Sequence, residues 1–121
     1  PLERRAARGR IAEAAAEADG LRLRRKLIED QILVEVNGLA IQATTADRLL
    51  ALAVDETALA NRMAEAERRR FQLGASDFIV VNLREESAAD ARLRQLDAEY
   101  RRAAARAELV AATVDRSQLG L

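Results

Sequence analysis

The sequence predicts an all-α fold, a long antiparallel helical hairpin of the coiled-coil type with unequal arms. Alanine, leucine, arginine and glutamate dominate the 121 residues, a composition typical of long helices and coiled coils. Apolar and small residues recur at spacings of three and four along most of the chain. Gly74 separates two such stretches and can take the left-handed conformation that ends a helix.

The first helix is predicted over about residues 3–73. At 1.5 Å per residue, roughly 70 residues span about 105 Å. An apolar stripe begins at Ala7 and Ile11, and a later run keeps the strict alternation of a coiled-coil seam. The members of that run are Ile32, Val36, Leu39, Ala43, Ala46, Leu50, Ala53, Thr57, Ala60 and Ala64. Gly38 lies next to this seam, where it is either a tolerated surface glycine or a point of close helix approach.

The turn is predicted at residues 74–76, as the tip of the hairpin. Ser76 or Asp77 can cap the next helix by accepting a hydrogen bond from a free backbone N–H. The arginines of residues 68–70 suit the negative end of the first helix dipole. Phosphate contact is the alternative for these arginines, and the neighbouring acids Glu65 and Glu67 favour the dipole interpretation.

The second helix is predicted over about residues 77–119. Its seam is expected at Ala89, Leu93, Leu96, Tyr100, Ala103, Ala107, Val110 and Val114. Taken alone, the apolar residues 78–81 could form a strand, but the capped start and the later pattern favour helix. These four residues cannot all face one helix. Either neighbours surround the tip or it exposes an apolar patch, and we favour contact with a partner or subunit.

If the two helices pair in an antiparallel arrangement, residues 77–119 lie against about residues 31–73. The second helix is then about 65 Å long. The first 30 residues then carry an apolar stripe with no partner in the chain. We expect helices of another subunit, or of a longer polypeptide, to cover it. The chain begins at Pro1 rather than methionine, so we expect a fragment of a larger protein.

Composition argues against several classes of function. The 20 basic and 20 acidic residues balance, which disfavours a general nucleic-acid binder. The chain has no histidine and no cysteine, so the usual zinc ligand sets and nucleophile–base pairs are absent. We therefore predict no enzyme activity, no cofactor and no metal site. The acids Glu85, Glu86 and Asp90 are interpreted as a charged helix face.

Two neighbouring motifs carry a family resemblance. The run Arg70-Phe71-Gln72-Leu73-Gly74, followed by Phe78-Ile79-Val80-Val81, resembles the aromatic-x-x-Gly tip of the TolC-like outer-membrane efflux protein family. The opening Pro1-Leu2, the helix leading to Glu35-Val36 and the ending Leu119-Gly120 are similar to the same family. The resemblance spans essentially the whole chain and matches the second repeat of proteins that have two repeats and barrel strands.

The resemblance implies a homotrimeric outer-membrane channel, with this segment in the periplasm and membrane contact only through barrel strands outside this chain. The tip would dock a periplasmic adaptor (membrane fusion) protein, which joins an inner-membrane transporter. The implied partner-binding residues are Phe71, Leu73, Gly74, Ala75, Ser76, Asp77 and Phe78. Some members carry acids that ring the tunnel entrance, but Val80 and Leu83 stand six and nine residues after Gly74 here, so ion selectivity is not transferred.

Two other functions fit the residues. An antiparallel coiled-coil scaffold or adaptor in the cytosol would have the same helical pattern. A nucleic-acid binder would use the arginine runs and would bind DNA or RNA in a salt-sensitive way. A signal peptide, barrel strands and a similar repeat upstream in the full reading frame would decide for the channel.

Overall fold

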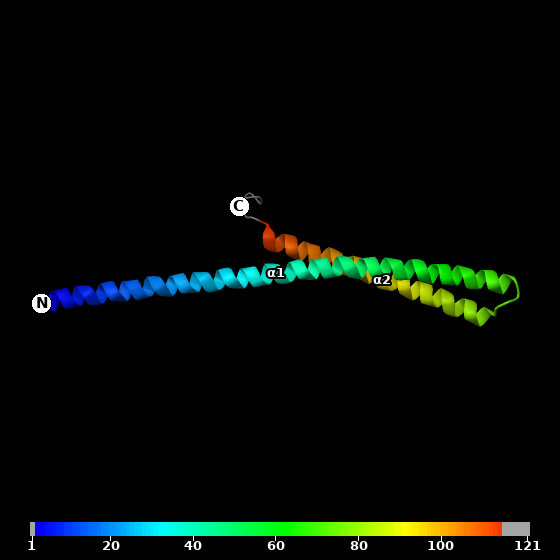
Figure 1. Cartoon of the computed structure of the whole chain (residues 1–121), viewed down its shortest axis with the longest axis horizontal. Coiled ribbons are helices and arrows are strands. Elements are labelled where there is room, and N and C mark those ends of the chain that lie inside the picture. Colours follow the sequence, from blue (N-terminus) through cyan, green and yellow to red (C-terminus); the bar gives the residue numbers. More distant parts are fainter. Residues whose placement is uncertain (1, 115–121) are drawn as a thin grey trace. The chain divides into compact units, whose positions relative to one another are not determined.

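The structure, a computed structural model, describes residues 2–114 of the chain and the side chains of residues 4–114. Helix α1 comprises Leu2–Gln72 and helix α2 comprises Phe78–Thr113, and the described residues form no strand (Figure 1). The predicted all-α hairpin is confirmed. The chain divides into two units, Pro1–Asn37 and Gly38–Leu121.

The first unit contributes the N-terminal part of α1. Its side chains from residue 4 to residue 35 are exposed, apart from a half-buried position at Gly20. The large apolar side chains on this surface are those of Ile11, Leu21, Leu23, Leu27, Ile28, Ile32, Leu33 and Val34. Within the unit, Arg22 pairs with Asp19 at 3.0 Å and Arg25 with Glu29 at 2.7 Å. The predicted stripe at Ile11 and Ile28 therefore lies on an exposed helix surface.

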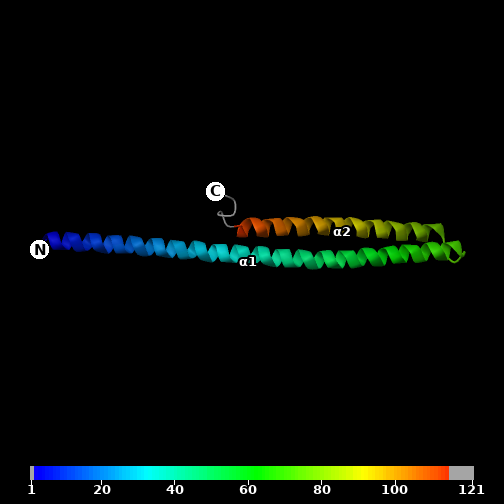
Figure 2. The same cartoon turned by 90° about the horizontal axis from the view of Figure 1, so that it is seen from above.

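In the second unit, α2 runs back along α1 (Figure 2). The Thr57 hydroxyl of α1 donates to the Ala91 carbonyl of α2 at 3.1 Å. Farther from the turn, Arg102 Nε donates to Asp47 Oδ1 at 2.6 Å. Both pairs lie within two residues of the expected alignment, so the predicted antiparallel register is confirmed.

The seam of α1 in this unit follows the predicted spacing. Its buried members are Ala43, Ala46, Ala53, Thr57 and Ala64, and the same spacing continues to a buried Glu67. The intervening seam positions Leu39, Leu50 and Ala60 are half-buried. Almost all the buried side chains are small, so the two backbones can lie close together, and the Thr57–Ala91 hydrogen bond requires that they do.

The seam predicted for α2 is wrong. The side chains that face α1 form an inner row, in which Val81, Ala88 and Ala91 are buried and Arg84, Gln95, Ala98, Arg102, Ala105 and Leu109 are half-buried. The predicted seam, apart from Val114, forms an exposed outer row of Ala89, Leu93, Leu96, Tyr100, Ala103, Ala107 and Val110.

Both rows of α2 alternate by three and four, so periodicity alone does not distinguish them. The prediction chose the row with the larger apolar side chains. The side chains that α1 buries against α2 are mostly alanines, and the small buried side chains of the inner row fit against them. The outer row therefore has no partner in this chain, and Leu93 is 64% exposed. Tyr100, expected to pack in the seam, is exposed for the same reason.

A Cβ atom on Gly38 would meet no atom within 4 Å, which supports the interpretation of a tolerated glycine over that of a close helix approach. One local expectation needs correction. Helix α2 ends at Thr113, where Val114 is extended with φ −68° and ψ 120°. These adjacent β-branched residues have low helix propensity, which favours an early end. The expected end near Leu119, like Pro1 and Leu119-Gly120, lies outside the described residues.

Candidate docking site at the hairpin tip

The tip, defined as residues 73–77, begins with a hydrogen-bonded helix end. The Ala75 N–H donates to the Arg70 carbonyl at 2.8 Å, and the Gly74 N–H donates to the Phe71 carbonyl at 2.9 Å. This pair of bonds is a Schellman motif, which requires a left-handed residue after the helix. Gly74 supplies it with φ 73°, the one positive φ among the described residues. The predicted function of Gly74 in ending the helix is confirmed.

The tip ends with a capped helix start. Asp77 is the N-cap of α2, with extended backbone, and its Oδ1 accepts a hydrogen bond from the Val80 N–H at 3.0 Å. Of the two predicted caps, Asp77 is the residue that caps α2. Ser76 instead donates its hydroxyl to Oε1 of Glu67, one turn before the end of α1.

Glu67 is a buried carboxylate at the base of the tip, only 7% exposed. Besides accepting from Ser76, it accepts from Arg70 Nη1 through Oε2 at 3.4 Å. Arg70 Nη2 in turn donates to the Ala75 carbonyl at 3.3 Å. We call this set of contacts, made by Glu67, Arg70, Ala75 and Ser76, the Glu67 bridge.

The sequence pattern identifies Glu67 only as an acidic neighbour of the arginines. The signal that could have found it is its spacing, because Glu67 follows Ala60 and Ala64 at the next position of the seam. A carboxylate at a buried seam position needs hydrogen-bond partners. Here the turn supplies one of them.

Large apolar side chains surround this ordered turn and remain exposed. Leu73 is 83% exposed and Ile79 is 76% exposed, and Phe78 is also exposed. The rings of Phe71 and Phe78 lie 6.4 Å apart at a tilted angle of 54°. The four apolar residues 78–81 differ in exposure. Val81 is buried against α1 and Val80 is half-buried, whereas Phe78 and Ile79 are exposed.

The structure brings all seven sequence-predicted site residues together at the turn. Phe71 lies in the last turn of α1, Phe78 begins α2, and Leu73, Gly74, Ala75, Ser76 and Asp77 form the tip itself. Ser76 is half-buried and the other side chains are exposed. Ile79 was outside the predicted site, although it belongs to the same exposed apolar surface.

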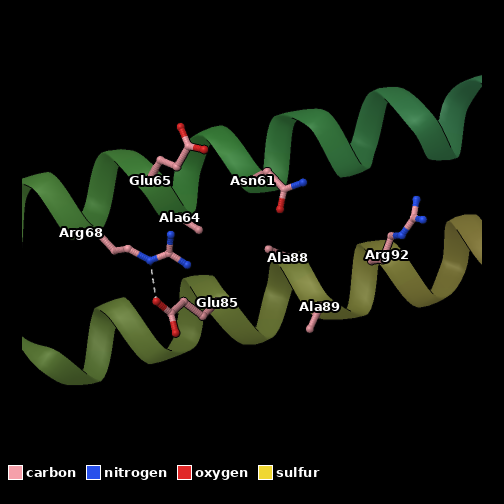
Figure 3. A pocket seen from close by; sticks show the side chains of 8 residues that line it. All are labelled: Asn61, Ala64, Glu65, Arg68, Glu85, Ala88, Ala89 and Arg92. Carbon is pink, nitrogen blue, oxygen red and sulfur yellow. Dashed lines mark hydrogen bonds and ion pairs between the residues drawn. The ribbon is translucent and has the colours of Figure 1, made fainter.

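A polar groove of about 380 Å³ lies between the two helices beside the tip (Figure 3). Its lining residues are Asn61, Ala64, Glu65, Arg68, Glu85, Ala88, Ala89 and Arg92. Arg68 Nε donates to Glu85 Oε1 across the groove at 2.6 Å. No group of three metal-ligating side chains occurs in the described part of the chain. The groove is therefore a region in which an ion pair joins the two helices.

Two of the three arginines before the tip pair with carboxylates, Arg68 with Glu85 and Arg70 with Glu67. Arg69 and Arg70 lie in the last turn of α1, as the dipole interpretation expects. Farther along the hairpin, Arg94 Nη2 donates to Glu56 Oε1 of α1 at 2.6 Å.

Asp47 accepts hydrogen bonds from both Arg106 and Arg102 of α2, at 2.9 and 2.6 Å. These bonds lower the pKa of the Asp47 carboxyl, because they favour its charged form. The ion pairs thus bind the two helices at several points along their length.

Comparison of the chain with protein-family models, curated proteins and solved structures found no match. Over the described residues, neither α1 nor α2 includes a stretch long and apolar enough to cross a membrane. The inference of function therefore rests on the hairpin, its tip and the sequence resemblance.

Proposed function

We propose that this chain is a tunnel-forming segment of a trimeric outer-membrane efflux channel and lies in the periplasm. In this proposal the tip docks a periplasmic adaptor protein, which connects the channel to an inner-membrane transporter. The segment performs no catalysis and binds no nucleic acid. The proposal combines the resemblance of the tip motif to TolC-like proteins with the geometry of the turn.

The observation that carries the proposal is an ordered turn that holds large apolar side chains in solvent. Leu73, Phe78 and Ile79 are all more than half exposed, although the turn itself is closed by a Schellman motif and an N-cap. An exposed apolar patch on a well-ordered element is typical of a protein-binding surface. A purely connecting turn would have no need of these side chains.

The sides of the hairpin support assembly with neighbouring hairpins. The outer row of α2 exposes Leu93 and Leu96, and α1 exposes Leu49, Leu52 and Leu59. On α1, Leu49 and Leu52 line an open groove of about 720 Å³ between the helices. Two different apolar surfaces on one hairpin allow each copy to contact one neighbour on each side, as a closed ring requires. The exposed stripe of the first unit would be covered in the same assembly.

The test uses the full-length protein with a photo-crosslinking amino acid in place of Leu73. We expect crosslinking to the adaptor in the parent protein and its loss in Gly74→Val. A β-branched residue at φ 73° is strained by at least about 1–2 kcal/mol, which distorts the turn. Efflux should fall together with crosslinking.

Gly38→Val is the matched control, because this glycine lies in α1 with open space around it. The control should keep both crosslinking and efflux. Intact efflux and crosslinking in Gly74→Val would show that the tip is not the docking point. If fractionation places the full-length protein in the cytosol, the coiled-coil scaffold would replace the channel.

A further inference from the structure

We infer that Glu67 is a positioning residue for docking, which acts through Ser76 and Arg70 to fix the conformation of the tip. The Glu67 bridge joins the last turns of α1 to residues 75 and 76. The part of this inference that concerns docking rests on the proposed function. The part that concerns the conformation of the tip does not.

The contacts of Glu67 explain how one carboxylate can fix the turn. Ser76 lies nine residues after Glu67, so their hydrogen bond closes the tip back onto α1. Arg70 occupies the other carboxylate oxygen and also reaches the Ala75 carbonyl. A buried carboxylate is retained only when such partners satisfy it, so the bridge and the turn depend on each other.

Packing of the helices does not require a glutamate at this position. The buried row of α1 leading to it contains Ala43, Ala46, Ala53, Thr57 and Ala64, and an alanine at residue 67 would continue the row. The Arg70 side chain is itself 61% exposed, so loss of the Glu67 carboxylate leaves no buried charge without a partner. The carboxylate therefore adds what an alanine could not, namely hydrogen bonds to the turn.

The bridge determines how the apolar side chains of the tip are presented. Leu73 lies inside the segment that the bridge spans, and Phe78 lies two residues after it. With the turn fixed, these side chains are held in one arrangement before a partner binds. Such preorganisation increases affinity because less conformational entropy is lost on association.

The first experiment measures amide hydrogen exchange of the whole chain in solution. In Glu67→Ala we expect the amides of Gly74 and Ala75, which donate to carbonyls of α1, to exchange about tenfold faster, the change that loss of a hydrogen bond to a charged group produces. Ser76→Ala should show a smaller increase in the same segment. Amides of residues 85–105 and the melting temperature should stay unchanged, because the helices still pack.

Two further variants serve as controls. Glu65→Ala removes an exposed carboxylate two residues away on the same helix and should leave exchange at the tip unchanged. Glu67→Gln keeps an oxygen that accepts from the Ser76 hydroxyl, so it should recover much of the lost protection. If neither Glu67→Ala nor Ser76→Ala speeds exchange at the tip, the inference is overturned.

The second experiment places the same variants in the full-length protein with the photo-crosslinker at residue 73. We expect Glu67→Ala to lose most crosslinking to the adaptor and Glu65→Ala to retain it. Faster exchange with unchanged crosslinking would overturn the assignment of Glu67 to docking. If the parent protein itself fails to crosslink to the adaptor, the proposed function fails, and the exchange measurement still decides the conformational part.

Discussion

The two rows of α2 have the same spacing and opposite environments. In the inner row, Ala88 and Ala91 are buried against α1, whereas in the outer row Leu93, Leu96 and Tyr100 are exposed. The larger apolar side chains are thus on the side that this chain leaves uncovered. Small residues hold the hairpin together, and large ones remain available for contacts beyond it.

The difference between the rows follows from what each surface packs against. The face of α1 that meets α2 consists mainly of alanine, with Thr57 bonded directly to the backbone of the other helix. Only small side chains fit between the backbones where Thr57 meets Ala91. A leucine at the buried position 88 or 91 would force the helices apart, but a leucine in the outer row meets no such restriction.

Enlarging the inner row should give the largest effect. Ala91 is 1% exposed, and its carbonyl accepts the hydrogen bond from Thr57. We expect Ala91→Leu to lower the free energy of unfolding by about 1–3 kcal/mol, because overpacking displaces the helices. Urea denaturation followed by circular dichroism measures this change.

Ala103→Leu makes the same substitution in the outer row, where the side chain is exposed. Leucine and alanine have similar helix propensities, so we expect little change in this control. Equal destabilisation by both substitutions would contradict the assignment of the two rows.

The sequence was sufficient for the helices, the register and the turn. Gly74 ends α1 and Asp77 caps α2 through the conformation and hydrogen bonds of the nearby backbone. Along α1, the apolar and small residues of the seam follow one consistent alternation of three and four. The seam of α2 was not predictable from hydrophobicity, because the choice between rows depends on the size of the surface that α1 presents. Glu67 was missed because its partner Ser76 becomes a neighbour only after the turn closes.

Truncating the outer row should have a small effect on the folded chain. Leu93 and Leu96 are exposed, so we expect Leu93→Ala with Leu96→Ala to change the free energy of unfolding by about 0.5 kcal/mol or less in dilute solution. Self-association of the chain at high concentration should fall, because less apolar surface is available. Sedimentation velocity measures this association. A large loss of stability in the dilute monomer would show that the outer row packs within the chain.

The smallest effect should come from the ion pair that joins Asp47 to Arg102 of the inner row and to Arg106. Both arginines lower the pKa of the Asp47 carboxyl in the folded chain below the ordinary value of 3.8. The pair therefore stabilises the folded chain at pH above that value, and its contribution is lost as the pH falls through the lowered pKa. All three side chains are substantially exposed to solvent, so the contribution at neutral pH should be small.

Asp47→Asn removes this charge, and Asp55→Asn makes the same change at an exposed position of α1 as a control. We expect Asp47→Asn to be less stable than the parent at pH 7, with the difference shrinking below pH 3.8. High salt should reduce the difference at pH 7, because it screens exposed charges. A difference that persists unchanged at low pH would contradict this assignment, because a protonated Asp47 carboxyl and an asparagine amide are both uncharged and nearly equal in size.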